Sequence, residues 1–532
     1  MQVRTKKKAS AQKPEGASQV AAQPYTFQAP VRGWIMTDSI ADPQPAGASR
    51  LDNWWPTTRG AKMRGGSVKY ATVPDPVETM FTYRSGTEHF FAATETDVYN
   101  ISSVADQDVA VTATVTGQTS GDYSSVQYGT AGGDYLLAVN GADDLLLYDG
   151  STFTPINAAS SPAITGVLTS AFTHAWSHAS RVWFVEGGSQ SAWYLPADSI
   201  AGAATEFSLA GVFRLGGSLL FGASWSLNAG DGLDDKCVFV STEGEVIIYE
   251  GTDPSNASTW ALAGRYRLPK PISRRSHIQA GGDLLVATEV GLIPVSAAVT
   301  TDLGAIETKA VSRPITPYWQ EQVGLTTSDW EIARLDEAGV MIVSQPVASS
   351  TSYKLMAVNM MTGAWSRITG WDAQCLGSFG GGSYFSDSDG LVFLMNAGGS
   401  DNGTPYTSLF IGQYESLGIY GVTKTVLQMR ANLLAGTPVN PSVTALIEYG
   451  EEPPSSPSSP ANFEGDVWDV GEWDVAVWDA TTAAQTVSDW VSVGRTGSVV
   501  APCLQLTSGT DIAPNVEIAA IEAQYVVGAA VA

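Results

Sequence analysis

The amino-acid sequence predicts an all-β protein in which a β-propeller of six to eight blades, seven preferred, is joined to a β-rich platform domain. Aromatic residues make up 10% of the 532-residue chain and glycine occurs 54 times, while long Ala/Leu/Glu/Lys runs of the kind that build helices are scarce. Short strand-like runs recur at nearly constant spacing over residues 81–400. The length also exceeds one ordinary core, which favours several domains or one large repeat.

The first 24 residues form a basic arm with almost no large apolar side chains to bury, so we expect this arm to be flexible. Its cations are Arg4, Lys6, Lys7, Lys8 and Lys13. The arm lacks the apolar segment of a secretory signal, and no stretch of the chain is apolar enough to predict a membrane span. We expect the arm to dock on an acidic neighbouring ring or adaptor, because its composition cannot fold alone.

Both ends of the chain supply the predicted platform domain, which comprises residues 25–80 and 401–532. After residue 400 the regular spacing stops, and strand-like segments follow at 424–434, 441–449 and 518–527. The strand-like opening segment can pair with them, since compact domains often bring their termini together. Residues 451–460, rich in proline and serine, predict an exposed, extended loop because proline cannot donate to a sheet ladder.

Seven strand-like runs define the predicted propeller over residues 81–400, each usually followed by a turn and a second strand. The runs begin at Phe90, Tyr135, Val182, Val238, Leu284, Val340 and Tyr384, with successive starts 44 to 56 residues apart. A propeller blade needs about 40 to 50 residues for its four antiparallel strands. Hairpin turn pairs occur at Asn140-Gly141, Asp149-Gly150, Glu243-Gly244 and Asp389-Gly390. The alternative is a pair of β-sandwiches with accidental spacing.

Tryptophan followed by aspartate occurs at Trp371, Trp468, Trp473 and Trp478, and the last three are five residues apart. The five-residue spacing excludes the Trp-Asp propeller repeat, whose period is about forty residues. Large aromatic side chains beside carboxylates suit a subunit contact, and Trp54 and Trp55 are further candidates for such a contact. A hairpin anchored by tryptophan within one chain explains the run equally well.

Motifs that carry catalysis are missing, so we expect no enzyme, no catalytic residues and no cofactor. The chain has no phosphate-binding glycine loop and no nucleophile elbow. A sialidase box needs Ser-x-Asp-x-Gly, and its nearest match, Ser386 to Gly390, has Ser388 where the box needs aspartate, so the chain has no clean copy of the box. Carboxylates are too numerous here for adjacency to indicate acid/base catalysis.

We expect no bound metal. His174 and His178 are four residues apart, the spacing of two ligands on a helix, but the surrounding sequence is strand-like and lacks the metalloprotease glutamate. The acidic segment 228–235 has oxygen ligands but not the EF-hand spacing, so we interpret it as a solvated turn. The three cysteines, Cys237, Cys375 and Cys503, are far apart and are interpreted as small buried hydrophobes.

The net charge of −25 excludes a protein whose main surface grips nucleic acid, because phosphate binding needs a face rich in Lys and Arg. It does not exclude a protein that DNA slides past. Charged residues are only 15% of the chain, below the roughly 25% of a typical soluble domain, and such a surface is easiest to keep soluble inside an assembly.

Two stretches resemble the tail nozzle or hub proteins of short-tailed bacteriophages, structural proteins that lie below the portal and adaptor. The first is ASRLDNWWP at 48–56 followed by Arg64-Gly65-Gly66, and the second, more specific one runs from Asn228 to Ser296 and contains YEGTDP, Trp260 and Arg274-Arg275. The Trp-Asp run is similar to segments of tail-tube proteins. Before its arginines the family has a glycine and a proline, where this chain has LPKP at 268–271.

The resemblance implies a structural virion protein, a homo-oligomeric sixfold ring, adaptor, portal and other tail proteins as partners, and an axial channel for genome retention and DNA ejection. It implies location in the virion tail after synthesis in the host cytoplasm, and no catalytic residues. A conduit that double-stranded DNA passes without specific binding is consistent with the acidic composition, so we expect mainly acidic and polar side chains along the channel.

Two other functions stay open. One is a carbohydrate-binding, host-recognition β-propeller. The other is a sialidase-like hydrolase, for which convergent carboxylates and arginines at the propeller mouth would be the best indication.

Overall fold

A computed structural model describes residues 21–37, 45–226, 235–325, 330–345, 355–436, 439–450, 452–459, 485–487 and 489–528. The chain is all-β, as predicted: strands dominate the described residues, and the two α-helices, α1 (Val295–Thr300) and α2 (Thr316–Leu325), are short. Four 3-10 turns are present at Thr169–Ala171, Ile306–Lys309, Arg313–Ile315 and Asp336–Ala338. Neither α-helix has the length or apolarity to cross a bilayer.

Seven small antiparallel sheets follow one another along the chain. The first contains β6 (Thr79–Arg84), β7 (Glu88–Ala93), β8 (Asp97–Asn100) and β9 (Ala113–Thr116). The second contains β10 (Ser124–Thr130), β11 (Gly133–Val139), β12 (Leu145–Tyr148) and β13 (Phe153–Ile156). The third contains β15 (Phe172–His178), β16 (Arg181–Glu186), β17 (Ser191–Tyr194) and β19 (Thr205–Ser208). Beside it, β14 (Ile164–Thr165) and β18 (Gly202–Ala203) form a parallel pair.

The remaining four small sheets complete the series. The fourth contains β20 (Leu219–Trp225), β21 (Lys236–Ser241), β22 (Glu245–Gly251) and β23 (Trp260–Arg267). The fifth has β24 (His277–Ala280), β25 (Asp283–Thr288) and β26 (Gly291–Pro294). The sixth has β27 (Glu331–Leu335), β28 (Val340–Ser344), β29 (Leu355–Asn359) and β30 (Trp365–Ile368). The seventh has β31 (Cys375–Phe379), β32 (Gly382–Ser386), β33 (Leu391–Met395) and, from far upstream, β5 (Ser67–Thr72).

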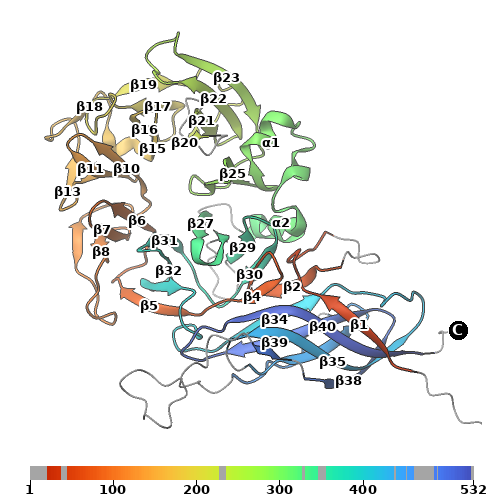
Figure 1. Cartoon of the computed structure of the whole chain (residues 1–532). Helices are drawn as coiled ribbons and strands as arrows, with labels where there is room; N and C mark the ends of the chain where they lie inside the picture. The colour runs from red at the N-terminus through yellow and green to blue at the C-terminus, as the bar shows by residue number, and fades with distance from the viewer. Residues whose placement is uncertain are drawn as a thin grey trace, which may run out of the picture.

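The small sheets lie side by side around a common centre, with the first strand of each sheet innermost (Figure 1). A buried hydrophobic cluster fills each junction between consecutive sheets, including the junction between the seventh and the first, and the cluster between the fifth and sixth sheets extends beyond them into the rest of the fold. In β11, for example, Leu136 and Ala138 pack toward the first sheet, whereas Leu137 and Val139 pack toward the third. Because successive side chains of a strand point to opposite faces, a strand covered on both faces is apolar throughout.

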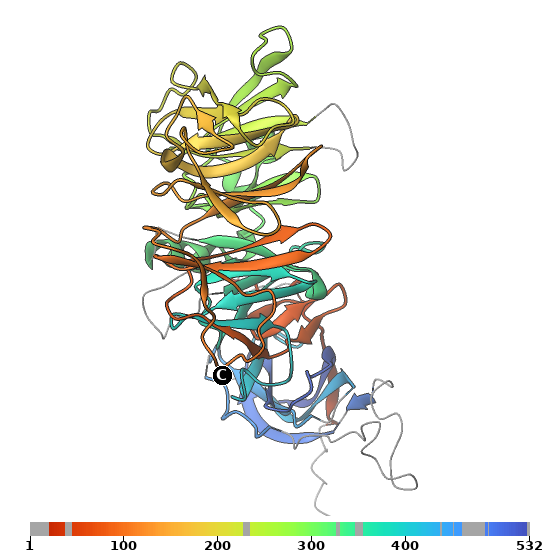
Figure 2. The same ribbon diagram turned by 90° about the vertical axis from the view of Figure 1, so that its left-hand side faces the viewer.

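Strands from both ends of the chain build two larger, stacked layers at the foot of the molecule (Figure 2). One layer contains β1 (Gln23–Gln28), β3 (Trp54–Pro56), β4 (Ala61–Met63), β35 (Lys424–Ala435), β37 (Gln485–Val487), β38 (Val491–Gly497) and β40 (Val516–Val527). The other contains β2 (Ala48–Asp52), β34 (Tyr406–Gly412), β36 (Ser442–Ile447) and β39 (Val500–Ser508), and continues into the sixth small sheet through β30. Alternate side chains of β35 and β40 are buried, which gives the two layers a shared core.

One segment lies elsewhere than the sequence suggests. Strand β5, within residues 25–80, pairs with β33 in the seventh small sheet instead of joining the large layers. The strand lengths alone do not reveal this, because pairing with a strand more than three hundred residues away depends on the tertiary arrangement. Residues 452–459 of the proline/serine segment form no strand, and each of them is exposed or half-buried.

Candidate functional site

A cluster of charged side chains lies where the first strands of the small sheets begin. The loop between β23 and β24 carries Arg274 and Arg275 into this region. Arg274 donates to the backbone carbonyls of Thr173 and Asp122, and its Nη2 lies 2.6 Å from Asp122 Oδ1. One side chain thus connects the loop before β24 to the starts of β10 and β15.

Arg275 connects a different set of sheets. Its Nη1 donates to the carbonyl oxygen of Glu78 at 2.9 Å and to Thr79 Oγ1 at 3.2 Å, at the start of β6. The same nitrogen lies 4.0 Å from Glu331 Oε2, on β27, and Nε lies 3.5 Å from Asp122 Oδ1. The two arginines therefore link five of the seven small sheets.

Two carboxyl groups of the cluster have pKa values that burial raises. Burial raises the pKa of Glu331, although the guanidinium of Arg275 opposes the shift. Burial also raises the pKa of Glu78, opposed by the N–H of Gly121 and reinforced by the charge of Asp122. Three carboxylates share this region with two guanidinium groups.

Two cavities flank the cluster. The larger has a volume of about 440 Å³ and is lined by Pro76, Val77, Glu78, Asp122, Arg275, Gln374 and Ser388. The smaller, about 330 Å³, shares Asp122 and Arg275 and is also lined by Arg274 and by residues of β15 and β20. Sequence reasoning picked out the arginine pair only through the family resemblance, without assigning it a position at the centre.

The two candidate histidines do not share a site. His174 donates from Nε2 to the carbonyl of Gly222 and accepts at Nδ1 from Ser124 Oγ, both at 2.9 Å. His178 Nδ1 lies 2.6 Å from Ser224 Oγ. Burial lowers the pKa of His174 to about 3 and that of His178 to about 4. Each imidazole is therefore neutral and bonded to a neighbouring sheet, and no cluster of three metal-ligating side chains occurs in the described part of the chain.

The prediction that Trp54 and Trp55 form subunit contacts is wrong. Their exposed fractions are 0% and 2%, because β3 places them in two different cores on its opposite faces. Trp55 Nε1 also donates to Asn396 Oδ1 at 2.9 Å. No surface of either ring is left for a second chain.

The other predicted contact residues lie outside the described ranges, as does most of the acidic segment 228–235. These residues are Trp468, Trp473 and Trp478, and the arm residues Arg4, Lys6, Lys7, Lys8 and Lys13. The three cysteines are buried and unpaired, as predicted.

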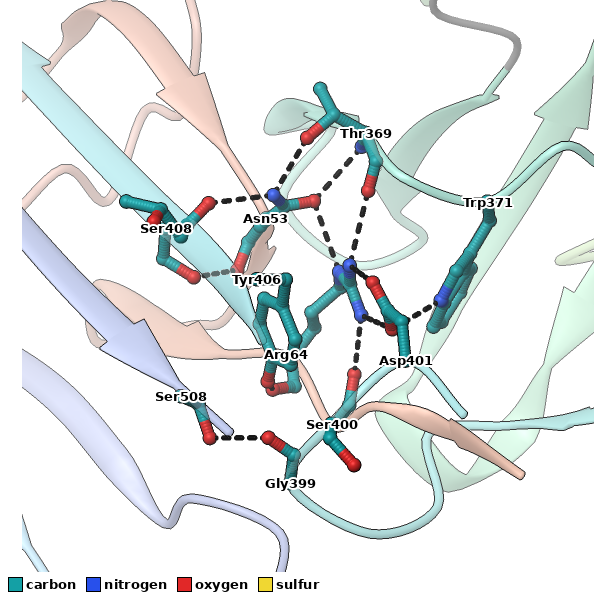
Figure 3. Close-up of polar contacts among 12 residues, drawn as sticks. Asn53, Arg64, Thr369, Trp371, Gly399, Ser400, Asp401, Tyr406, Ser408 and Ser508 are labelled. Carbon is teal, nitrogen blue, oxygen red and sulfur yellow. Dashed lines mark hydrogen bonds and ion pairs between the residues drawn. The ribbon is translucent and has the colours of Figure 1, made fainter. Parts of the chain in front are cut away.

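A second polar cluster joins the small sheets to the large layers (Figure 3). Arg64 is fully buried; its Nη1 and Nη2 lie 2.8 and 2.7 Å from the two oxygens of Asp401, and its Nε donates to Asn53 Oδ1 at 3.0 Å. The guanidinium carbon lies 3.8 Å from the ring centre of Tyr406 and 4.5 Å from that of Trp371. This arrangement is suited to holding the two parts of the molecule together.

No protein-family model and no curated protein sequence matches the chain. Among solved structures, it is similar to the extracellular domain of a B. thetaiotaomicron protein described as the one component system BT4673, with 10% identity and a TM-score of 0.40 over 74% of this chain. The chain spans 57% of that structure's length. The computationally designed Ika8 protein gives 8% identity and a TM-score of 0.34, covering 62% of this chain and 99% of Ika8. Chaetomium thermophilum Raptor gives 10% identity and a TM-score of 0.37, covering 63% of this chain and 28% of Raptor.

Proposed function

We propose that the chain is a structural protein of a bacteriophage tail, in which a seven-bladed β-propeller stands on a platform built from the two large layers. Copies assemble into a sixfold ring around a channel for DNA. The propeller assignment is supported by the seven consecutive small sheets, by the hydrophobic cluster in each junction, and by β5, which completes the seventh sheet and directly precedes the first.

The observation that carries the assembly proposal is the open form of the larger platform sheet. Within the described residues, β1 pairs only with β40 at one edge, and β38 pairs only with β35 at the other. An edge strand exposes backbone N–H and C=O groups that can pair with another chain. Two different open edges on one sheet favour head-to-tail contacts, which generate a ring when the rotation closes.

The outward face of the same sheet suits a channel wall. Its half-buried side chains pair across β35 and β40: Arg430 lies 2.7 Å from Glu522, and Gln428 donates to Gln524 at 2.8 Å. Paired, polar side chains leave little net charge on this face, so DNA would pass along it without its phosphates being bound. Rings of unpaired Lys or Arg along the bore of the assembly would contradict this proposal.

Negative-stain imaging of the full chain tests the assembly, with rings and a central opening as the expected result. Val491→Lys places a charge on the exposed edge strand β38 and should abolish the rings. Val109→Lys is the matched control, because Val109 is an exposed valine in the loop before β9. A wild-type chain that stays monomeric at high concentration, or rings that persist in the Val491→Lys variant, would overturn the proposal.

The family resemblance extends the proposal to partners. The ring would contact the adaptor and portal, with the N-terminal arm as the docking element. Deleting residues 1–20 should weaken attachment to the adaptor while the rings still form. Unchanged attachment would remove the arm from the proposal without affecting the ring.

A sialidase-like hydrolase is the second candidate, because arginines and carboxylates do converge where the first strands begin. The guanidinium groups of Arg274 and Arg275 are, however, already bonded to carboxylates and backbone carbonyls. Binding of an anionic sugar needs hydrogen-bond donors that are not already directed at protein acceptors. Turnover of a fluorogenic sialoside by the purified chain would favour the hydrolase over the tail protein. Glycan-array binding without turnover would favour the host-recognition propeller.

A further inference from the structure

The neutral side chains of the larger cavity are oriented as hydrogen-bond acceptors. Gln374 donates from Nε2 to Asp372 Oδ1 at 3.3 Å, and Ser388 donates its hydroxyl proton to Asp372 Oδ2 at 3.2 Å. With one N–H of Gln374 and the hydroxyl of Ser388 directed at Asp372, the amide oxygen and the second N–H of Gln374 and the oxygen lone pairs of Ser388 are left for the cavity. Asp372 thereby determines how both neutral lining groups are presented.

The charged side chains of the cavity follow the same pattern. Glu78 accepts the N–H of Gly121 at Oε2, 3.0 Å away, and Asp122 Oδ1 forms an ion pair with Arg274 Nη2 at 2.6 Å without accepting a hydrogen bond. Each of these two carboxylates has a second oxygen with unused lone pairs. Arg275 is the cationic lining residue, and its donors are directed to the start of β6 and to Asp122. The wall of the cavity is thus rich in acceptors and poor in free donors.

We propose that this cavity binds a protonated amine: a ligand whose alkylammonium or guanidinium group donates to Glu78, Asp122, Gln374 and Ser388. A cation with several N–H groups can donate to these acceptors together, and its charge adds to that of Arg275 in offsetting the repulsion between the two carboxylates. The same group can come from a free diamine or from a lysine or arginine side chain of a partner protein. The proposal does not depend on ring assembly.

Isothermal titration calorimetry of the full chain tests this site with three probes. Putrescine represents a free diamine, N-acetyl-lysinamide represents a protein side chain, and 1,4-butanediol is a neutral molecule of the same length as putrescine. We expect saturable binding of at least one amine, weakened by added salt, and no binding of the diol. Tighter binding of putrescine assigns the site to a free diamine, and tighter binding of N-acetyl-lysinamide assigns it to a partner's side chain.

Three variants connect the binding to the cavity. Glu78→Gln keeps the side-chain shape and removes the charge, and should weaken amine binding about tenfold. Ser388→Ala removes one exposed acceptor at little risk to folding and should weaken binding by a smaller factor. Glu307→Gln, at an exposed carboxylate away from the cavity, should bind as the wild type does. Absence of amine binding, equal binding of the diol, or unchanged affinity in both Glu78→Gln and Ser388→Ala would overturn the proposal.

Discussion

Replacing Arg64 with methionine should strongly destabilise the protein. The substitution keeps most of the side-chain volume but removes the charge from a residue with 0% exposure. Asp401, whose side chain is 14% exposed, then loses both of its hydrogen bonds from the guanidinium. Thr369 O loses its bond from Arg64 as well, and Asn53 Oδ1 keeps only the N–H of Thr369 (Figure 3).

The size of the effect follows from the burial. Removing one partner of a buried ion pair costs about 3 to 5 kcal/mol, because the other charge remains buried without compensation. Arg59 provides the matched control, since its ion pair with Glu517 at 2.9 Å involves an arginine side chain that is 77% exposed. Such surface pairs contribute about 0 to 1 kcal/mol. Arg64→Met should therefore lower the free energy of unfolding by at least about 2 kcal/mol more than Arg59→Met does.

Thermal unfolding followed by tryptophan fluorescence measures the difference, and Arg64→Met should lower Tm by several degrees more than Arg59→Met. Hydrogen exchange adds a local readout, with faster exchange at residues 64–66 and 399–402. In the double variant Arg64→Met/Asp401→Asn, part of the lost stability should return, because no uncompensated charge remains. Equal Tm values for Arg64→Met and Arg59→Met would refute the interpretation of this cluster as a joint.

Three further predictions concern pH, backbone packing and thiols. Burial lowers the pKa of His174 to about 3 and that of His277 to about 4. The unfolded chain binds these protons near pH 6.5, so stability should fall as the pH drops from about 6.5 to 4, by about 1.4 kcal/mol per pH unit for each histidine. A flat pH profile of Tm would contradict this. Gly66→Ala should destabilise strongly, because a Cβ there would lie 2.0 Å from Ser400 O, whereas Gly86→Ala meets nothing within 4 Å and should be nearly neutral in urea unfolding. The three buried cysteines should resist a thiol reagent in the native protein and react fully in denaturant, and rapid native reaction would show that the cores open.

Much of the local structure follows from the sequence. All seven starting residues of the strand-like runs, from Phe90 to Tyr384, lie in the second strand of a different small sheet. These strands are covered on both faces, so they form unbroken apolar runs that are easy to recognise. The glycines of the four predicted hairpin turns all have positive φ, between 77° and 94°, which explains why glycine stands there.

The sequence by itself determined the strand content, the seven-fold recurrence and the turns, because these depend on side-chain polarity and backbone freedom over a few neighbouring residues. Only the tertiary structure decided that β5 completes the seventh sheet, that Trp54 is buried in the core, and that Arg64 meets Asp401. It also decided that Arg274 and Arg275 lie at the centre of the sheets. Each of these outcomes joins residues far apart in the chain, and the pairing energy of such residues depends on which surfaces the whole fold brings together.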